Sequence, residues 1–208
     1  DVGLALFGIA PATEGSIRLH GQDLQIQSPR RAMDLGIAYV SEDRRKLGLA
    51  MALPIFANIS LASLRKLLSV VGLIDRKAER AMAEGYRKQL DIRSADTLIE
   101  VGKLSGGNQQ KVMLAKWLET KPKVLISDEP TRGIDVGAKS EIYKLLNALA
   151  QQGRAIVMIS SELPEVLRLS HRILVMCEGR ITGELKAGEA TQENIMQYAT
   201  QRETTQLN

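Results

Sequence analysis

The sequence predicts an α/β fold with a mostly parallel β-sheet flanked by helices, an antiparallel β portion and an inserted helical segment. Four runs of strand length are apolar at successive positions, which is typical of strands buried on both faces of a parallel sheet. Helical patterns separate these runs, and residues 54–103 are rich in Ala, Leu, Lys, Arg and Glu without a convincing strand. The apolar runs are residues 36–40, 123–127, 155–159 and 172–176.

The remaining elements follow from local signals. Residues 15–21 alternate between turn glycines and predict an antiparallel strand, and residues 180–185 after the Glu178-Gly179 turn predict another. Ser28 and Pro29 are a cap and a first-turn proline for a helix over 30–35. Ile142, Leu145, Leu146 and Leu149 have helical spacing, and Gly153 marks the stop.

Composition excludes several classes of protein. Among 208 residues, 28 Lys and Arg against 24 Asp and Glu give a net charge of only +4, too small and too dispersed to indicate nucleic acid. The single cysteine, Cys177, excludes an internal disulfide, and together with only His20 and His171 it argues against a zinc site. The uncharged stretch 47–64 reaches the length of a membrane span, but its Gly, Pro, Asn and Ser content favours a loop followed by a buried or docking helix.

A first candidate for chemistry is the run 124–126, which leads through Ser127 into Asp128-Glu129. Two adjacent acids at the carboxyl end of a buried strand form the arrangement of a Walker B element, and ligands bind at that edge of a parallel sheet. Asp128 would hold Mg²⁺ through water, and Glu129 would polarise the attacking water as general base. The alternative is a pair of surface acids at a strand end.

The second candidate is Ser105-Gly106-Gly107-Asn108, which opens a helix reaching to about Glu119. Ser105 is a good N-cap, and two glycines let the backbone approach an anion closely. The helix N-terminus adds free N–H donors and a favourable dipole, so the segment predicts a phosphate-binding end without a lysine. The alternative is an ordinary capped helix.

Taken together, these two motifs resemble the ATPase domain of ATP-binding cassette (ABC) transporters, a P-loop NTPase-like fold, over essentially the whole chain. In this resemblance Leu104 to Asn108 is the signature motif, 124–131 is Walker B and Asp135 lies in the D-loop. Longer strings at 40–44, 106–111, 131–139 and 160–165 are similar to the second, C-terminal cassette of ribose-, galactose- and xylose-type importers.

The sequence departs from this family in three places. No Gly-x4-Gly-Lys-Ser/Thr loop (Walker A) occurs in the 208 residues, and we expect its strand and loop to lie just before Asp1, cut off rather than mutated. Glu42 stands where the family usually has the Q-loop glutamine, and Ser161 where it usually has the switch histidine. We therefore expect this cassette's own ATP site to be weak or inactive.

The resemblance also implies cofactors and partners. ABC cassettes dimerise head to tail, so Ser105 to Asn108 would contact ATP and Mg²⁺ held by another cassette, of the same polypeptide or of a homodimer. Further implied partners are membrane permease subunits and, indirectly, a periplasmic sugar-binding protein, but no nucleic acid. The protein would lie at the cytoplasmic face of the bacterial inner membrane as a peripheral subunit.

We expect one partial ABC ATPase domain over 1–208, with an α/β core over 1–53 and 104–208 and a helical subdomain over 54–103. In the family, the uncharged stretch lies where a permease helix docks, so Leu53, Ile55 and Phe56 would form an apolar groove. Alternatively they pack inside the helical segment.

Three other functions stay open. A catalytically silent regulatory or structural cassette is favoured by the missing loop, Glu42 and Ser161. A non-transport ABC ATPase of the chromosome-maintenance or DNA-repair kind would need a long coiled coil, for which Glu42 and Leu104 are too close. An unrelated small kinase is remote, because it would not combine the two motifs.

Overall fold

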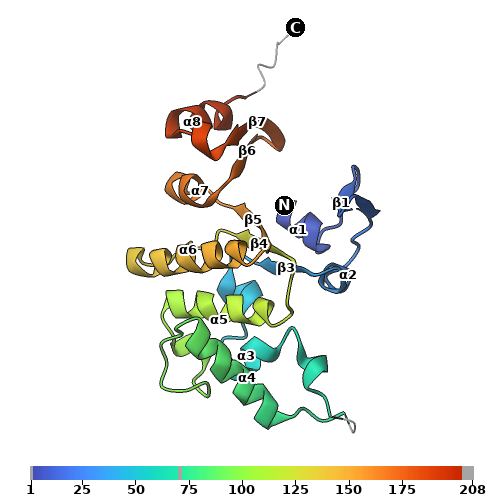
Figure 1. Ribbon diagram of the computed structural model, residues 1–208, viewed down its shortest axis with the longest axis vertical. Coiled ribbons are helices and arrows are strands. Elements are labelled where there is room, and N and C mark those ends of the chain that lie inside the picture. The colour runs from blue at the N-terminus through green and yellow to red at the C-terminus, as the bar shows by residue number, and fades with distance from the viewer. Residues whose placement is uncertain (1, 70–71, 203–208) are drawn as a thin grey trace. The chain divides into compact units, whose positions relative to one another are not determined.

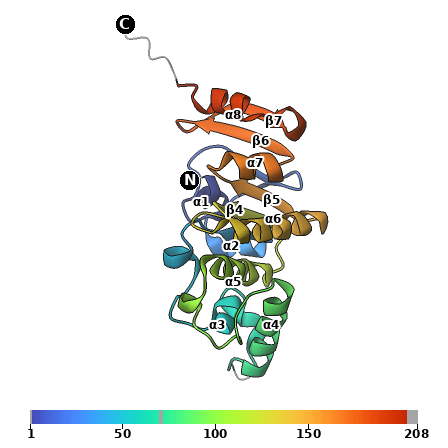
Figure 2. The ribbon, with the colours of Figure 1, turned by 90° about the vertical axis from the view of Figure 1, so that its left-hand side faces the viewer.

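The computed structural model describes residues 2–69 and 72–202. Its contacts divide the chain into two units, one ending at Ile159 and one beginning at Ser160. Figure 1 and Figure 2 show the elements of the first unit, which are α1 (Val2–Phe7), β1 (Ile17–Leu19), β2 (Gln22–Leu24), α2 (Pro29–Asp34), β3 (Ile37–Val40), a π-helix (Arg44–Gly48), α3 (Ile55–Ser60), α4 (Arg76–Gln89), α5 (Gly106–Leu118), β4 (Val124–Asp128), α6 (Val136–Gln151) and β5 (Ala155–Ile159), with short 3₁₀ helices at Leu64–Leu67 and Val101–Lys103.

Three of the four apolar runs form the predicted parallel sheet, in the order β3-β4-β5. Ile37 pairs with Val124 and Val124 with Ala155, so the carboxyl ends of the three strands share one edge. Helices α1, α2 and α5 contact β3, and α6 contacts β5. All four residues of β3 are buried, as expected for a strand covered on both faces.

The predicted antiparallel strand over residues 15–21 is confirmed in part, because residues 17–19 form β1, which pairs with β2 in a hairpin, while His20 and Gly21 form the turn. Its turn residues His20 and Gly21 have φ of 52° and 77°, the left-handed pair that a tight two-residue hairpin turn requires. The helix after Ser28 is confirmed as well, with the Ser28 hydroxyl accepting a hydrogen bond from the Arg31 N–H.

The region between β3 and α5 is helical, as predicted. Helices α3 and α4 pack against each other, and α3 also packs on α5. Ile55 and Ile59 are fully buried, and buried Asn58 ties the preceding loop to α3 by exchanging hydrogen bonds with the Ala50 backbone. The boundaries proposed for a separate helical subdomain, 54–103, stay a prediction.

The second unit contains α7 (Leu163–Leu169), β6 (Arg172–Cys177), β7 (Arg180–Lys186), a 3₁₀ helix (Ala187–Glu189) and α8 (Gln192–Ala199). The expectation that residues 172–176 belong to the parallel sheet is wrong, because β6 pairs antiparallel with β7. Ile173 and Val175 are buried, whereas Leu174 and Met176 are 45% and 47% exposed. In a strand that is covered on one face, buried and exposed side chains alternate in this way. The alternation is not visible in the sequence, because the exposed side chains here are apolar too.

The uncharged stretch 47–64 folds into loops and α3. Among the residues that the structure describes, no helix is long and apolar enough to cross a membrane. The loop-and-helix interpretation of this stretch is confirmed.

Candidate functional site

The carboxyl-terminal edge of the parallel sheet carries the two predicted acids. Asp128 is the last residue of β4, and its Oδ2 accepts a 2.7 Å hydrogen bond from the Tyr39 hydroxyl of β3. Glu129 follows directly, and its backbone N–H donates to the Ile159 carbonyl of β5 at 2.8 Å. The pair therefore lies at the edge where parallel α/β sheets bind ligands, as the sequence predicted.

Glu129 adopts a backbone conformation that side chains rarely take. Its φ is 46°, in the left-handed region, which costs a non-glycine residue roughly 1–2 kcal/mol. The hydrogen bond to Ile159 helps to hold this conformation. The chain thus leaves the strand direction between Asp128 and Glu129, and such strain concentrates at functional positions.

Tyr39 is a member of this edge that the sequence did not reveal. Its ring is buried and stacks on Phe7 with centroids 5.6 Å apart. Burial, followed by the hydrogen bond to the Asp128 carboxylate, raises the pKa of the Tyr39 hydroxyl well above its ordinary value. The hydroxyl therefore stays protonated and orients Asp128 as a fixed donor.

The start of α5 differs from the predicted cap in one respect. Ser105 occupies the N-cap position, but its hydroxyl accepts a 2.9 Å bond from Asn108 Nδ2 instead of from the helix backbone. Asn108 Oδ1 in turn accepts from the Arg93 N–H at 2.8 Å. Because first-turn N–H groups have no intrahelical acceptor, those of Gly106, Gly107 and Asn108 stay available as donors.

Both signature glycines also lie in close packing contacts. A Cβ atom on Gly107 would lie 2.6 Å from the Ala138 Cβ, so the glycine lets α5 approach α6 closely. A Cβ atom on Gly106 would lie 2.8 Å from Arg44 Nη2 and 3.2 Å from the Gly133 carbonyl. The sequence suggested only a role toward an anion, since the packing partners are distant along the chain.

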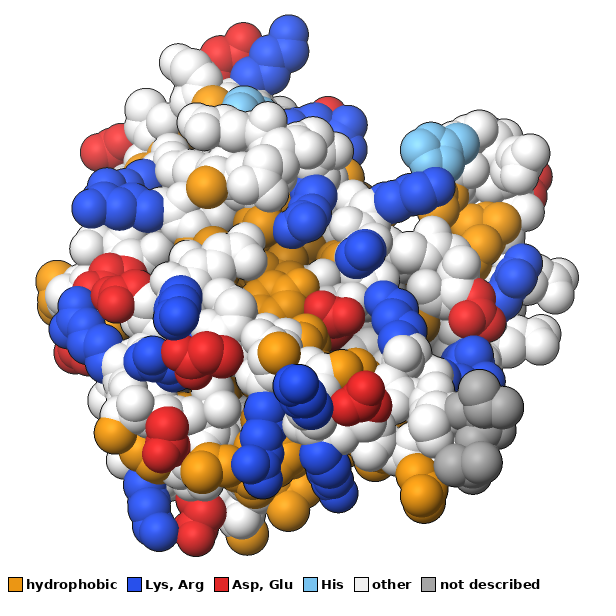
Figure 3. All heavy atoms as spheres, turned by 60° about the horizontal axis from the view of Figure 1, so that its bottom comes forward, with side chains coloured by type: hydrophobic (Ala, Val, Ile, Leu, Met, Phe, Trp, Pro, Cys, Tyr) orange, Lys and Arg blue, Asp and Glu red, His pale blue; other side chains and the backbone are white. Residues whose placement is uncertain are grey.

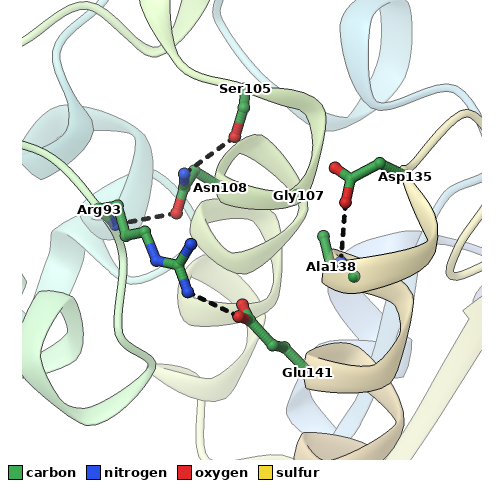
Figure 4. Close-up of a pocket in the computed structure, with 8 residues that line it drawn as sticks. Arg93, Ser105, Gly107, Asn108, Asp135, Ala138 and Glu141 are labelled. Atoms are coloured by element: carbon green, nitrogen blue, oxygen red, sulfur yellow. Dashed lines mark hydrogen bonds and ion pairs between the residues drawn. The ribbon is translucent and has the colours of Figure 1, made fainter.

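The start of α6 brings Asp135 to the same place. Asp135 is the N-cap of α6, and its Oδ1 accepts a 2.9 Å bond from the Ala138 N–H. Figure 4 shows Ser105, Asn108 and Asp135 around one pocket of about 190 Å³, which is lined by Arg93, Ser105, Gly107, Asn108, Asp135, Gly137, Ala138 and Glu141. We call it the signature pocket.

An ion-pair network braces one side of the signature pocket. Arg93 Nη2 lies 2.7 Å from Glu141 Oε1, and the buried Lys111 Nζ lies 2.9 Å from Glu141 Oε2 and donates to the Asp91 carbonyl. The hydrogen bond from Lys111 is the main reason that the pKa of Glu141 is lowered. The network joins α4's C-terminal loop, α5 and α6, and the local sequence gave no sign of it.

The two departing positions lie in different units of the chain. Glu42 follows β3, and its Oε2 is paired with Arg132 Nη1 at 2.8 Å in the loop after β4. Ser161 belongs to the second unit, where it is exposed and precedes α7. Glu42 thus shares the loops at the edge of the parallel sheet with Asp128 and Glu129.

Comparison with known proteins places the chain in a family. The family model for the ABC transporter matches residues 4–132. The chain belongs to the ABC transporter family. It is 57% identical over its whole length to a Burkholderia lata protein with the provisional name ribose/galactose/methyl galactoside import ATP-binding protein 1, and covers 40% of that protein. It is 50% identical over 94% of its length to the ribose import ATP-binding protein RbsA of Caldanaerobacter subterraneus subsp. tengcongensis, and again covers 40%.

Solved structures confirm the ABC ATPase fold. A dimeric ATP-binding cassette in a post-hydrolysis state with ADP and phosphate matches with a TM-score of 0.74, at 20% identity over 89% of this chain and 79% of the other. A nucleotide-free cassette matches with a TM-score of 0.75, at 22% identity over 96% and 79%. This ABC chain spans about two fifths of the length of the curated relatives named above.

Proposed function

We propose that this chain is the second, C-terminal ATP-binding cassette of a bacterial monosaccharide importer, and that it contributes its signature motif to ATP held by a partner cassette. The observation that carries the proposal is the signature pocket, where Ser105, Gly107 and Asn108 from α5 meet Asp135 at the start of α6. Backbone donors and a helix N-terminus suit phosphate oxygens, and the names of the relatives supply the expectation of sugar import.

Each motif has a separate task in this proposal. The free N–H groups of Gly106, Gly107 and Asn108 and the Ser105 hydroxyl hydrogen-bond the phosphates of the partner's ATP. Glu129 takes a proton from the attacking water at this cassette's own site. Asp128, held by Tyr39, would hold the water shell of Mg²⁺.

The donor set fits Mg²⁺ in the manner of nucleotide sites. Among the described residues, no cluster of three His, Cys, Asp or Glu side chains forms a cage for a metal. Mg²⁺ at nucleotide sites needs only one or two carboxylates in addition to waters and phosphates, which Asp128 satisfies. When bound there, Mg²⁺ would neutralise phosphate charge.

This cassette's own ATP site is the weaker one in the proposal. Glu42 brings a negative charge where the family usually has a neutral glutamine, and Ser161 cannot act as an imidazole. These substitutions favour a second candidate function, a catalytically silent cassette whose only contribution is the signature pocket.

The α3–α4 surface is the proposed contact with membrane permease subunits. Ile55 is fully buried and does not line a groove, whereas Leu53 is 43% exposed and Phe56 lies beneath Arg80 at 5.5 Å. A groove of about 440 Å³ contains Leu53, Phe56, Leu61 and Leu64, and Figure 3 shows hydrophobic side chains among charged ones on the face that carries α3 and α4. Such a subunit would lie at the cytoplasmic face of the inner membrane.

The decisive experiment measures ATP hydrolysis by the full-length subunit with its permease after Gly106→Leu. The new side chain would meet Arg44 and the Gly133 carbonyl and distort the donor surface, so we expect kcat to fall at least about 100-fold. Gly85→Leu, on an exposed face of α4 with open space around it, is the matched control and should keep kcat. Unchanged turnover in Gly106→Leu would refute the signature assignment.

A second measurement tests the proposal on the 208-residue chain by itself. The 208-residue chain alone should bind ATP poorly and hydrolyse none measurably, because the signature pocket acts on ATP held by a partner, and Glu42 and Ser161 stand where the family usually has a glutamine and a histidine. Turnover by the chain alone at rates typical of transport ATPases would contradict the proposal.

A further inference from the structure

The Arg44 side chain contacts two functional segments besides its own. Arg44 is the first residue of the π-helix, which follows Glu42 in the segment after β3. Its Nη1 donates to the Arg132 carbonyl at 2.9 Å and its Nη2 to the Gly133 carbonyl at 3.2 Å, both in the loop that leads to Asp135. Its Nε donates to Gln109 Oε1 on α5 at 3.3 Å. We call this set of contacts the Arg44 junction.

The Arg44 junction reaches the signature motif through two further contacts. Gln109 Nε2 donates to the Leu104 carbonyl at 2.9 Å, directly before Ser105. Gly106 lies against the guanidinium, since a Cβ atom there would be 2.8 Å from Arg44 Nη2. The position of the donor-bearing turn of α5 therefore depends on where Arg44 holds the neighbouring loop.

A reciprocal ion pair closes the same two loops. Arg132 Nη1 reaches back to Glu42 Oε2 at 2.8 Å, while Arg44 bonds the carbonyls of Arg132 and Gly133. Gly133 has a φ of 66°, so its carbonyl is presented by a conformation that favours glycine. Movement of the loop after β4 would break contacts with both Glu42 and Arg44.

The geometry requires arginine rather than another cation. A planar guanidinium offers several N–H donors in a fixed fork, and here three of its nitrogens donate to three acceptors on two segments. A lysine ammonium is a single point on a flexible stem and cannot span the same acceptors. Burial is the main cause of a lowered pKa of Arg44, in keeping with a partly enclosed guanidinium.

We propose that Arg44 is a positioning residue that sets the loop carrying Asp135 against the signature turn, so that both present the geometry required by the partner's ATP. This inference rests on the proposed trans-acting signature, and adds the residue that fixes its shape. Arg44 itself need not contact nucleotide, since its donors are already used within the chain.

The test compares Arg44→Met, Arg44→Lys and Arg45→Met in the full-length subunit with its permease. Arg45 is the matched control, because it is the exposed neighbour with the same charge. We expect Arg44→Met to lower kcat about tenfold or more while KM for ATP changes less than about threefold, because a displaced donor surface loses transition-state contacts. Arg44→Lys should recover only part of kcat, and Arg45→Met should match the wild type.

Hydrogen exchange of the same variants supplies a readout that does not depend on turnover. The amides of Gln109 and Ile134, bonded to Ser105 and Thr131, report the two segments. Both should exchange about tenfold faster in Arg44→Met than in Arg45→Met, while amides of α4 keep their rates. If Arg44→Met fails to fold, Arg44→Lys carries the same comparison at smaller amplitude.

The outcomes separate the inference from the proposed function. Wild-type kcat in Arg44→Met, a loss confined to KM, or a loss of kcat without faster exchange would each overturn the positioning role. A wild-type subunit without ATP turnover would instead refute the proposed function. In that case the exchange rates alone decide whether Arg44 orders the two segments.

Discussion

The signature pocket and the edge of the parallel sheet are built from opposite chemistry. The pocket offers a ligand the first-turn N–H groups of Gly107 and Asn108, because its two carboxylates are already bonded, Asp135 to the Ala138 N–H and Glu141 to Arg93 and Lys111. The sheet edge is rich in acceptors, with the carboxylates of Glu42, Asp128 and Glu129 following β3 and β4. A triphosphate needs donors, whereas a metal ion and an attacking water need carboxylates.

This difference teaches how one chain can hold two unlike halves of a site. Hydrogen bonds within the chain hold the donor half in place. Asn108 bonds both the Ser105 hydroxyl and the Arg93 N–H, and Asp135 accepts from the Ala138 N–H. In the acceptor half, the Glu42 carboxylate is paired with Arg132 and the Asp128 carboxylate is held by Tyr39. In the proposed function, the donor half acts on a nucleotide held by a partner cassette.

The largest effect on stability is expected on the pocket side. Gly107→Leu forces a side chain into the α5–α6 contact, where even a Cβ would lie 2.6 Å from Ala138 Cβ. Overpacking at a contact between two helices should lower the free energy of unfolding by about 3 kcal/mol. Urea unfolding measures this, with Gly85→Leu on exposed α4 as the control that should not destabilise. Equal stability of both variants would mean that the close α5–α6 approach is wrong.

A smaller effect is expected at the sheet edge from Tyr39→Phe. The variant keeps the ring stacked on Phe7 but removes the hydrogen bond to Asp128, which should cost about 1 kcal/mol at pH 7. The pKa of Tyr39 is raised in the folded protein, so above about pH 10 the unfolded chain loses this proton first. Unfolding is then favoured as pH rises, and the advantage of the wild type over the variant should shrink.

Unfolding curves at several pH values check this prediction. If the free energy of unfolding of the wild type and that of Tyr39→Phe change in parallel from about pH 8 to about pH 11, Tyr39 does not orient Asp128.

The smallest effect is expected for Glu129→Gln in the full-length subunit. If this cassette's own site is inactive, turnover should change less than about twofold, although Glu129 stands at the position of the general base. Steady-state ATP hydrolysis, measured beside Gly106→Leu, makes the contrast direct. A loss of kcat of about tenfold or more would show that the sheet edge forms an active ATP site. The proposed difference between the two regions would then be wrong.

Much of the architecture could be predicted because its signals are local. The continuous apolar runs predicted β3, β4 and β5, the cap at Ser28 predicted α2, and the alternation after Gly15 predicted β1 but not its pairing with β2. The same local view failed for β6, where Leu174 and Met176 are apolar but exposed. Apolar side chains do not report which face of a strand is covered.

The partners of the motif residues could not be predicted. Tyr39 reaches Asp128 across 89 positions, and Arg44 reaches the Gly133 carbonyl across another 89. Neither residue type is diagnostic alone, and no alternation or spacing links such distant positions. Only the register of β3 against β4 brings them together.

The sequence by itself determined the motifs and the elements that carry them, since strand, cap and turn preferences depend on neighbouring residues. The tertiary structure decided that Asn108 accepts a hydrogen bond from the Arg93 N–H while it bonds the Ser105 hydroxyl, and that Asp135 lines the same pocket. It also decided that Glu129 takes a left-handed backbone. These features depend on hydrogen bonds and close packing between segments far apart in the chain, and such contacts exist only once the sheet and its helices have assembled.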